Sequence, residues 1–290
     1  MSAIVFAAWL SLRKGTLCLK LAIQTSRLPG ETLADKFRNA SRFGFDAVEV
    51  TIGPDFDLAE HLDELREASA LAGLPVSGIC THSIHDPLMP DEAERANRFA
   101  GLASLVRMAD DLGADGVISV PVRRAVAFPG VEDLERELAD LAVAEFGRWS
   151  RSLPEGKAAV FLEPLNRYEA TFLRRVEQAA DIAGRIGSPR VRSLADFFHM
   201  NIEEADMADP IRRAAPQLGY VHIADNNRLQ PGAGCLNFQP PFRALKEVGY
   251  EGYVSIECTG FGGPLEAGGL EAMLPETVRY TRAEWAAAHE

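Results

Sequence analysis

The feature that most constrains this chain is its regular alternation of strand-like and helix-like segments. Apolar runs rich in β-branched residues alternate with segments whose apolar residues recur at helical spacing. Several of these helices are predicted to end at a glycine, such as Gly44, Gly73 or Gly113. Each strand–helix unit is about 30 residues long, the size of a βαβ unit. Strict alternation of this kind predicts a parallel sheet covered by helices.

Eight such units follow one another from residue 17 onward. The predicted strands cover residues 17–26, 46–52, 75–83, 116–122, 157–162, 191–197, 218–224 and 252–258. The predicted helices cover residues 31–43, 58–72, 92–112, 131–151, 172–186, 209–215, 241–248 and 272–288. Eight units in a chain of 290 residues fit a closed (β/α)8 barrel, an α/β fold in one domain.

An open doubly wound sheet is the alternative fold, but no glycine-rich fingerprint follows the first strand and no boundary divides the chain. Residues 17–290 are therefore predicted to form a single barrel. Residues 1–16 are interpreted as an N-terminal extension. Their apolar run, residues 3–10, is far shorter than the roughly 20 residues of a membrane helix. Its basic residues follow the run, whereas those of a signal peptide precede it.

The net charge narrows the kinds of molecule that the chain can bind, and its cysteines indicate the cell compartment. The net charge of −12 argues against nucleic acid, because affinity for the phosphate backbone requires clustered lysine and arginine. It leaves room for a small anionic ligand held by a few arginines. The four cysteines are scattered, without the spacing of a metal or redox motif, and a chain of this length needs no disulfide scaffold. We therefore expect a cytoplasmic protein with no membrane segment.

Four consecutive strand ends carry residues of the types that bind metal ions. Glu163 ends the fifth predicted strand, Asp196 the sixth, His222 lies near the end of the seventh, and Glu257 ends the eighth. They are separated by 33, 26 and 35 residues, each about one strand–helix unit. Active-site residues of such barrels lie where strands run into the following loops, so these four side chains should meet at the barrel mouth.

A buried carboxylate such as Glu163 requires a strong partner, and three clustered carboxylates repel one another unless a cation lies between them. Two glutamates, one aspartate and one histidine suit a divalent ion. Mn²⁺ or Co²⁺ is the first expectation, with Mg²⁺ and Zn²⁺ as alternatives. An isolated acidic residue at another strand end, Glu49, is instead expected to pair with a neighbouring arginine or lysine.

A second group of polar residues follows the same strand ends. His199 comes three residues after Asp196, where the strand is expected to have turned into its loop, and Glu169 and Arg228 lie after the fifth and seventh strands. Arg123 and Arg124 directly follow the fourth strand, where they could hold a phosphate or carboxylate. Pairing with the many acidic residues of the chain is an equally good explanation for each arginine.

Three motifs in the second half resemble those of D-tagatose 3-epimerase-type ketose epimerases, in the xylose isomerase-like TIM-barrel superfamily. They are Glu-Pro-Leu-Asn-Arg-Tyr-Glu (163–169), Asp-Phe-Phe-His-Met-Asn-Ile-Glu-Glu (196–204) and His-Ile-Ala-Asp-Asn-Asn-Arg (222–228). The first half resembles the superfamily only through Gly-Phe-Asp-Ala-Val-Glu-Val (44–50). The resemblance implies that Glu163, Asp196, His222 and Glu257 are metal ligands, and that Glu169, His199 and Arg228 contact substrate.

The expected activity is a metal-dependent epimerisation of a ketose or related keto-sugar, in which Glu163 and Glu257 exchange protons at the carbon beside the carbonyl. Arg123 and Arg124 depart from what a neutral-sugar epimerase would require and indicate an anionic or larger substrate. The alternatives are an aldose–ketose isomerase or keto-polyol dehydratase on the same site, an apurinic-site endonuclease, and a non-catalytic sugar-binding barrel. Members of the superfamily are commonly dimers or tetramers, so a homo-oligomer is expected.

Overall fold

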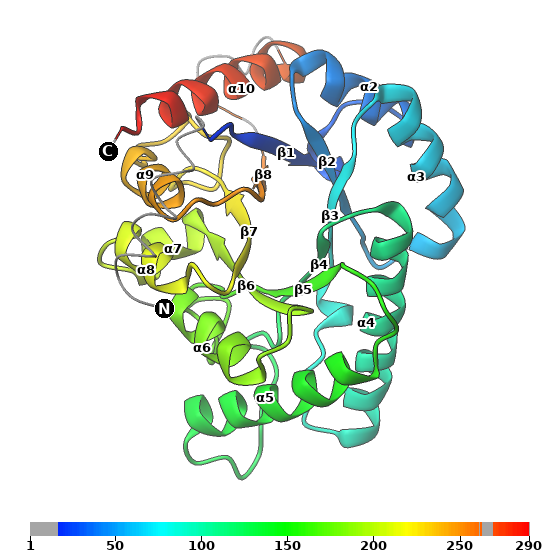
Figure 1. The fold of residues 1–290 in the computed structure, drawn as a ribbon, viewed down its shortest axis with the longest axis vertical. Coiled ribbons are helices and arrows are strands. Elements are labelled where there is room, and N and C mark those ends of the chain that lie inside the picture. The colour runs from blue at the N-terminus through cyan, green and yellow to red at the C-terminus, as the bar shows by residue number, and fades with distance from the viewer. Residues whose placement is uncertain (1–16, 261, 263–268, 290) are drawn as a thin grey trace, which may run out of the picture.

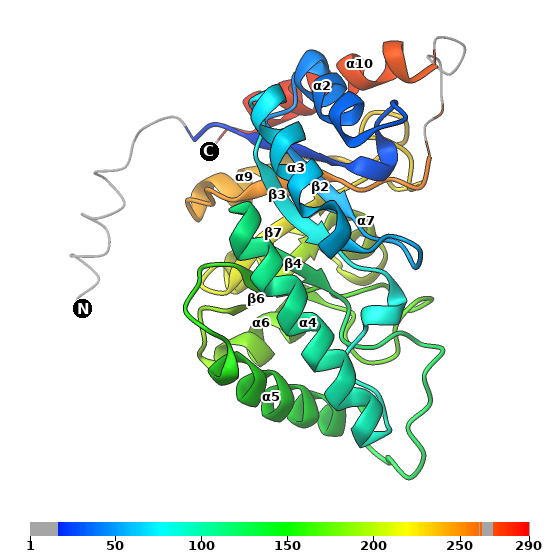
Figure 2. The same ribbon diagram turned by 90° about the vertical axis from the view of Figure 1, so that its right-hand side faces the viewer.

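The computed structural model describes residues 17–260, 262 and 269–289. Its eight strands are all parallel and close into a barrel in the order in which they occur in the chain. The ring of strands lies inside a layer of helices (Figure 1), and α4 and α5 run along the outside of the barrel (Figure 2). The predicted single-domain (β/α)8 barrel is thus confirmed. The predicted extension, residues 1–16, lies outside the described residues.

The strands are short and the helices between them longer. The strands are β1 (Lys20–Gln24), β2 (Ala47–Thr51), β3 (Val76–Cys80), β4 (Gly116–Ser119), β5 (Ala159–Leu162), β6 (Val191–Asp196), β7 (Leu218–Ile223) and β8 (Tyr253–Ile256). The helices are α2 (Leu33–Phe43), α3 (Leu58–Ala72), α4 (Glu92–Leu112), α5 (Leu134–Ser152), α6 (Val176–Ile186), α7 (Phe197–Glu203), α8 (Ala208–Ala214), α9 (Gln239–Glu247) and α10 (Gly269–Ala287). Two short 3-10 turns, η1 (Thr25–Arg27) and η2 (Ser83–His85), follow β1 and β3.

Helix ends follow local sequence signals. At the start of α4 the Asp91 carboxylate accepts the N–H of Glu94 at 2.8 Å, and at its end Gly113 adopts a left-handed conformation with φ 69°. None of the described helices is long and apolar enough to cross a membrane. None of the four cysteines, all of which lie among the described residues, forms a disulfide.

Two helices differ most from the sequence prediction. Helix α6 begins at Val176 rather than at residue 172, because Phe172 and Leu173 are buried in the preceding loop, where Leu173 accepts a backbone bond from Leu165. Helix α7 was not predicted: its residues were expected to continue a strand into a loop. It forms because the carboxylate of Asp196 accepts the N–H of Phe198 at 2.8 Å and caps the helix.

The barrel interior is filled by side chains. Phe161 and Tyr220 stack there with ring centroids 5.2 Å apart. Glycines allow this packing, since a Cβ on Gly219 would overlap the Phe161 ring. A larger apolar cluster lies between the strands and the surrounding helices. The interior therefore provides a rigid support for side chains at the strand ends.

The loops after β3 and β4 are joined by a buried ion pair. Asp86 is almost inaccessible, and its Oδ2 lies 3.0 Å from Nε of Arg123. Burial raises the pKa of the Asp86 carboxyl to about 7, although the charges of Arg123 and Arg98 oppose the shift. Arg98 of α4 also donates to the carbonyls of Ser83 and Asp86, and these bonds anchor the loop after β3 to that helix.

Two glycine-to-alanine substitutions should change stability in opposite directions. In Gly116→Ala the new Cβ would overlap the carbonyl oxygen of Ala159 on the adjacent strand, and we expect a loss of about 1–3 kcal/mol. In Gly101→Ala, within exposed α4, no heavy atom lies within 4 Å, and we expect a gain of about 0.5–1 kcal/mol. Urea unfolding measures the change in the free energy of unfolding for both variants, and equal changes would contradict the contacts described.

The Asp86 pKa predicts a pH-dependent contribution to stability. Because its folded-state pKa lies above the unfolded value of about 3.9, Asp86 stabilises the fold at low pH, and this contribution is lost as pH rises through about 7. Asp86→Asn removes that dependence. The unfolding free energy of the variant relative to wild type should increase by about 2–3 kcal/mol from pH 5 to pH 8. The exposed Asp55→Asn serves as control, and parallel curves for Asp86→Asn and wild type would refute the assignment.

Candidate metal centre and active site

The barrel brings the four predicted metal ligands to one end. Asp196 is the last residue of β6 and lies beside His222 of β7 in the strand register. Glu163 and Glu257 directly follow β5 and β8, where their N–H groups donate to Ser119 and Ile223 carbonyls of the neighbouring strands at 3.0 Å each. These backbone bonds extend the barrel ladder by one residue, so both glutamates start from fixed positions.

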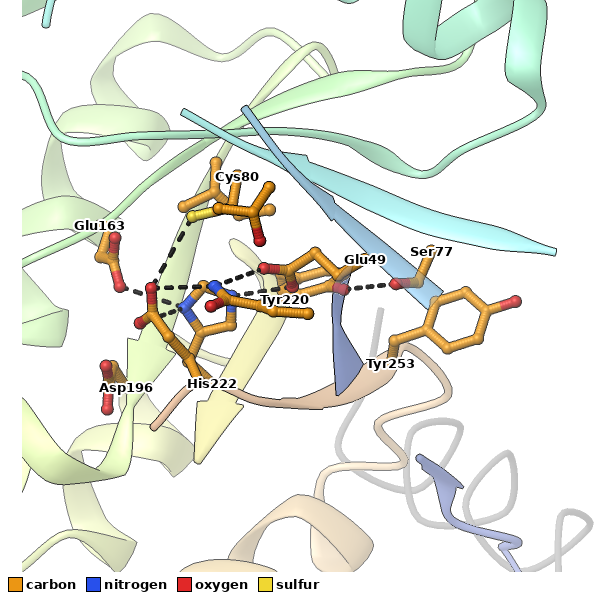
Figure 3. A network of polar contacts seen from close by, with 12 residues as sticks. Glu49, Ser77, Cys80, Glu163, Asp196, Tyr220, His222 and Tyr253 are labelled. Carbon is orange, nitrogen blue, oxygen red and sulfur yellow. Dashed lines mark hydrogen bonds and ion pairs between the residues drawn. The ribbon is translucent and has the colours of Figure 1, made fainter. Parts of the chain in front are cut away.

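Glu163, Asp196, His222 and Glu257 each offer a ligand atom, and these four atoms lie within 4.8 Å of one another. Nδ1 of His222 lies 3.1 Å from Oε1 of Glu163 and 3.1 Å from Oε2 of Glu257. The first three residues are buried, and the Glu257 side chain is 18% exposed. Figure 3 shows the imidazole with its Nδ1 edge toward Glu163. Of these four side chains, that of Glu257 is the most exposed to solvent.

The neighbouring charges act differently on the two glutamates. Burial and the charge of Glu257 raise the pKa of Glu163. Burial opposes ionisation of Glu257 as well, but the charges of His222 and Arg228 hold its pKa well below the usual range. Burial would lower the pKa of His222, yet Glu49 and Glu257 raise it well above the usual value. These shifts show how strongly this cluster attracts positive charge.

The donor set fits a divalent ion. Three carboxylates and one imidazole nitrogen, mostly buried and converging on one point, are ligands suited to Mn²⁺, Co²⁺, Mg²⁺ or Zn²⁺. Structural zinc sites use mainly thiolates and imidazoles, and the Cys80 thiol donates to Glu257 at 3.7 Å. The exposure of Glu257 leaves a direction from which a small molecule can reach the centre.

His199 and Glu169 lie together beside this cluster. Nδ1 of His199 accepts the N–H of Asn166 at 3.1 Å, which leaves the ring proton on Nε2, 3.6 Å from Oδ2 of Asp196. The Asn166 amide also donates to Glu169 Oε1 at 3.1 Å. His199 is buried within α7 rather than in a loop, whereas the Glu169 side chain is 48% exposed. His199 thus borders the candidate metal ligands directly, and Glu169 is linked to them through His199.

Arg228 is the cation nearest to the four ligands. Its guanidinium donates to Asp196 and Glu257 at 2.7 Å each and lies over the Phe198 ring, 4.4 Å from its centroid. The backbone of Arg228 has φ 61°, the left-handed region that a non-glycine residue seldom adopts. The chain therefore holds this guanidinium in place at the expense of local strain.

Arg123 and Arg124 lie farther from the ligands than the other predicted residues. Arg123 pairs with Asp86 through Nε, and no described residue pairs with its two terminal amino groups. Arg124 donates from Nη1 to the carbonyl of Arg167 at 3.0 Å, and from its backbone to the carbonyl of Glu169 at 2.8 Å. It therefore connects the loop after β4 to the segment that carries Glu169.

Glu49 was assigned the wrong partner by sequence. It is fully buried, and its Oε2 lies 2.9 Å from Nε2 of His222, while Oε1 accepts from Gln24 at 2.9 Å. No lysine or arginine of the described residues bonds to it. Gln24 also donates to Glu257 at 2.9 Å. Neither contact was predicted, although a glutamate inside the apolar strand Ala47–Thr51 was a signal that it serves the site.

A cavity of about 680 Å³ lies at the other end of the barrel. It is lined by residues that precede strands, among them Asp115, Lys157 and Gly252. None of the predicted site residues borders it, so it has no part in this centre.

Comparisons with known proteins identify the family and the relatives of this chain. The xylose isomerase-like TIM-barrel family profile matches residues 37–283. The 3-dehydro-D-guloside 4-epimerase of Escherichia coli is 29% identical over 250 residues, which cover 82% of this chain and 92% of the relative. The D-psicose 3-epimerase of Enterocloster bolteae is 32% identical over 226 residues, covering 75% and 73%.

A solved structure shows the same architecture. The apo form of 3-keto-D-glucoside 4-epimerase from Escherichia coli superimposes with a TM-score of 0.74 at 26% identity, covering 92% of this chain and all of that one. The barrel, the relatives and the family profile agree with the resemblance seen in the three motifs. The chain belongs to the xylose isomerase-like TIM-barrel family and is an enzyme of the isomerase class, with sugar epimerases as its relatives.

Proposed function

We propose that this enzyme is a divalent-metal-dependent epimerase that inverts the carbon next to the carbonyl of a ketose or related keto-sugar. The observation that carries the proposal is the pair Glu163 and Glu257, which reach one centre from different strands and contact the same atom of His222. Their surroundings shift their pKa values in opposite directions. Such a pair suits a reaction in which one carboxyl group takes a proton while the other gives one.

The activities of the two relatives share one chemical feature. The 4-epimerase acts beside a 3-keto group, and the 3-epimerase acts on psicose, a 2-ketose. In both, the inverted carbon is adjacent to a ketone, where removal of a proton gives an enediolate. We propose the same chemistry for this chain, because its two glutamates approach one centre from different strands.

Each residue then has a defined task. One of the two glutamates removes the proton from one face and the other returns a proton to the opposite face, and their roles exchange for the reverse reaction. A divalent ion held by Glu163, Asp196, His222 and Glu257 would supply Lewis-acid stabilisation of the charge that develops on the substrate oxygens. Arg228 and the Nε2–H of His199 would donate hydrogen bonds to those oxygens. Glu169, whose side chain is exposed to solvent, would orient a hydroxyl group of the substrate.

Several finer assignments belong to the proposal. The ion is Mn²⁺ or Co²⁺, and the substrate is a small carbohydrate. The enzyme works in the cytoplasm as a homo-oligomer and binds no nucleic acid, in keeping with its net charge of −12.

The proton-transfer proposal predicts solvent exchange. In D₂O with Mn²⁺, wild type should incorporate deuterium at the inverted carbon of a keto-sugar substrate, because the abstracted proton mixes with solvent. Glu163→Gln and Glu257→Gln should each lower this rate by about 10²–10⁴-fold, since an amide cannot accept the proton. Mass spectrometry of the sugar measures the incorporation.

Glu203→Gln is the matched control, because Glu203 is also a glutamate near the loop after β5 but is bonded to Arg167. It should retain exchange. Chelation of the metal should abolish turnover and added Mn²⁺ should restore it. Full exchange in both active-site variants would contradict the two-base proposal, and a product with a moved carbonyl or lost water would assign the site to isomerisation or dehydration.

Arg123 supports an anionic substrate. Asp86 holds its Nε side, and the two terminal amino groups have no partner among the described residues. The Asp86–Arg123 pair lies close enough to the centre for the charge of Glu163 to affect the pKa of Asp86. An arginine fixed on one side and free on the other is arranged to bind a carboxylate or phosphate.

Substitution of Arg123 should therefore discriminate between substrates. Arg123→Met should raise KM for a carboxylated or phosphorylated keto-sugar by about 10–100-fold, the loss of one charged hydrogen bond, and change KM for neutral ketoses little. Arg167→Met, which removes an arginine bonded to Glu203, is the control. Equal KM changes for charged and neutral sugars would contradict this role, as would a failure of every anionic keto-sugar to react.

A further inference from the structure

A chain of buried polar side chains runs from the barrel interior to the metal ligands. Ser77 of β3 and Tyr220 of β7 share a hydrogen bond at 2.7 Å, and burial together with the charge of the nearby Glu49 of β2 raises the pKa of the Tyr220 hydroxyl. Glu49 in turn contacts Nε2 of His222 at 2.9 Å. In Figure 3 these residues lie one beside the next in space, with the His222 ring between Glu49 and Glu163. The chain joins strands that are not neighbours in the barrel.

Glu49 is an unusual residue to find at its position. Its side chain is fully buried, and taking an ionised carboxylate out of water is strongly unfavourable unless it is well paired. Its hydrogen-bonding partners are Gln24 and His222. Packing alone would favour an apolar residue here, so the carboxylate requires a functional explanation.

The imidazole geometry supplies that explanation. Nε2 faces Glu49, and the other ring nitrogen, Nδ1, faces Glu163 and Glu257. A carboxylate that accepts the Nε2 proton leaves the Nδ1 lone pair directed at the ligand cluster. The opposite tautomer would place a proton where the ion binds. An outer carboxylate bonded to a metal-binding histidine also fixes the ring orientation and strengthens the nitrogen as a ligand.

We propose that Glu49 is a positioning residue of the metal centre, which holds His222 in the tautomer and orientation that present Nδ1 to a divalent ion. This inference rests on the proposed metal site. Glu49 itself touches neither the ion nor the substrate, and acts through His222.

Gln24 extends the same arrangement to a second ligand. Its Nε2 carries two hydrogens, and it donates one to Oε1 of Glu49 and the other to Oε1 of Glu257, both at 2.9 Å. An amide nitrogen can thus satisfy two carboxylates without adding a charge. The positions of Glu49 and Glu257 are therefore coupled through one side chain.

The Glu49→Gln variant tests the proposal. Glu49 accepts on both oxygens, from His222 and from Gln24, whereas an amide has one acceptor and must turn its NH₂ group toward one of these donors. We expect Mn²⁺ affinity, measured by calorimetry on the metal-free protein, to fall by about 10–100-fold. In Zn²⁺-loaded protein with isotope-labelled histidine, the Nε2 proton of His222 should move upfield and exchange faster with water.

A matched control separates positioning from general destabilisation. Leu65→Ala opens a cavity beneath α3, away from the site, and should lower the unfolding midpoint with unchanged Mn²⁺ affinity and unchanged Nε2 proton signal. If Glu49→Gln does not fold, Glu49→Asp replaces it: the charge is kept, the 2.9 Å contact is lost, and a smaller decrease in affinity is expected.

The outcomes are distinguishable. Wild type that binds no Mn²⁺, Co²⁺, Mg²⁺ or Zn²⁺ would contradict the proposed metal dependence itself. Wild type that binds Mn²⁺, together with a Glu49 variant of equal affinity and an unshifted Nε2 proton, would overturn only the role of Glu49. A loss of affinity in both Glu49→Gln and Leu65→Ala would also overturn it, since destabilisation alone would then account for the effect.

Discussion

The concentration of negative charge around one imidazole is the constraint on which the rest of this site depends. Four carboxylates, those of Glu49, Glu163, Asp196 and Glu257, lie within reach of His222 or of one another. Such a cluster is unfavourable in a buried setting unless positive charge is present. Arg228 provides part of that charge. A divalent ion would provide more, and its attraction to the cluster follows from the same electrostatics.

The parallel barrel makes this concentration attainable. All eight strands point the same way, so residues at their carboxyl ends converge, and the interior stacking of Phe161 and Tyr220 keeps the strands at fixed distances. The register that sets Asp196 beside His222 belongs to the barrel itself. The site therefore needs no flexible loop to bring its ligands together, although His199 and Arg228 require the short helix and loop that follow.

The sequence was sufficient for the barrel and for the convergence of Glu163, Asp196, His222 and Glu257 because both depend on spacing. Ligands on consecutive strands recur at intervals of about one strand–helix unit, and those intervals are visible in the chain. The contact between Glu49 and His222 has no such signature. It joins β2 to β7 across the barrel interior, and pairing across a barrel leaves no regular interval in the sequence. Helix α7 was not predicted because Asp196 has three roles at once. It ends a strand, caps the helix and is a candidate metal ligand.

Arg228 shows how the fold maintains a group that electrostatics alone would not position. Its left-handed backbone is held on both sides: its N–H donates to the Asp225 carbonyl at 2.9 Å, and its own carbonyl accepts the N–H of Thr259 at 2.9 Å. The buried Asp225 carboxylate accepts further backbone bonds from Gly232 and Leu236 at 2.9 Å. A residue in this conformation costs about 1–3 kcal/mol, and it persists where surrounding bonds over-determine it. Because those bonds tie the loop after β7 to the residues that follow β8, the guanidinium stays between Asp196 and Glu257, where a substrate oxygen beside the ion would meet it.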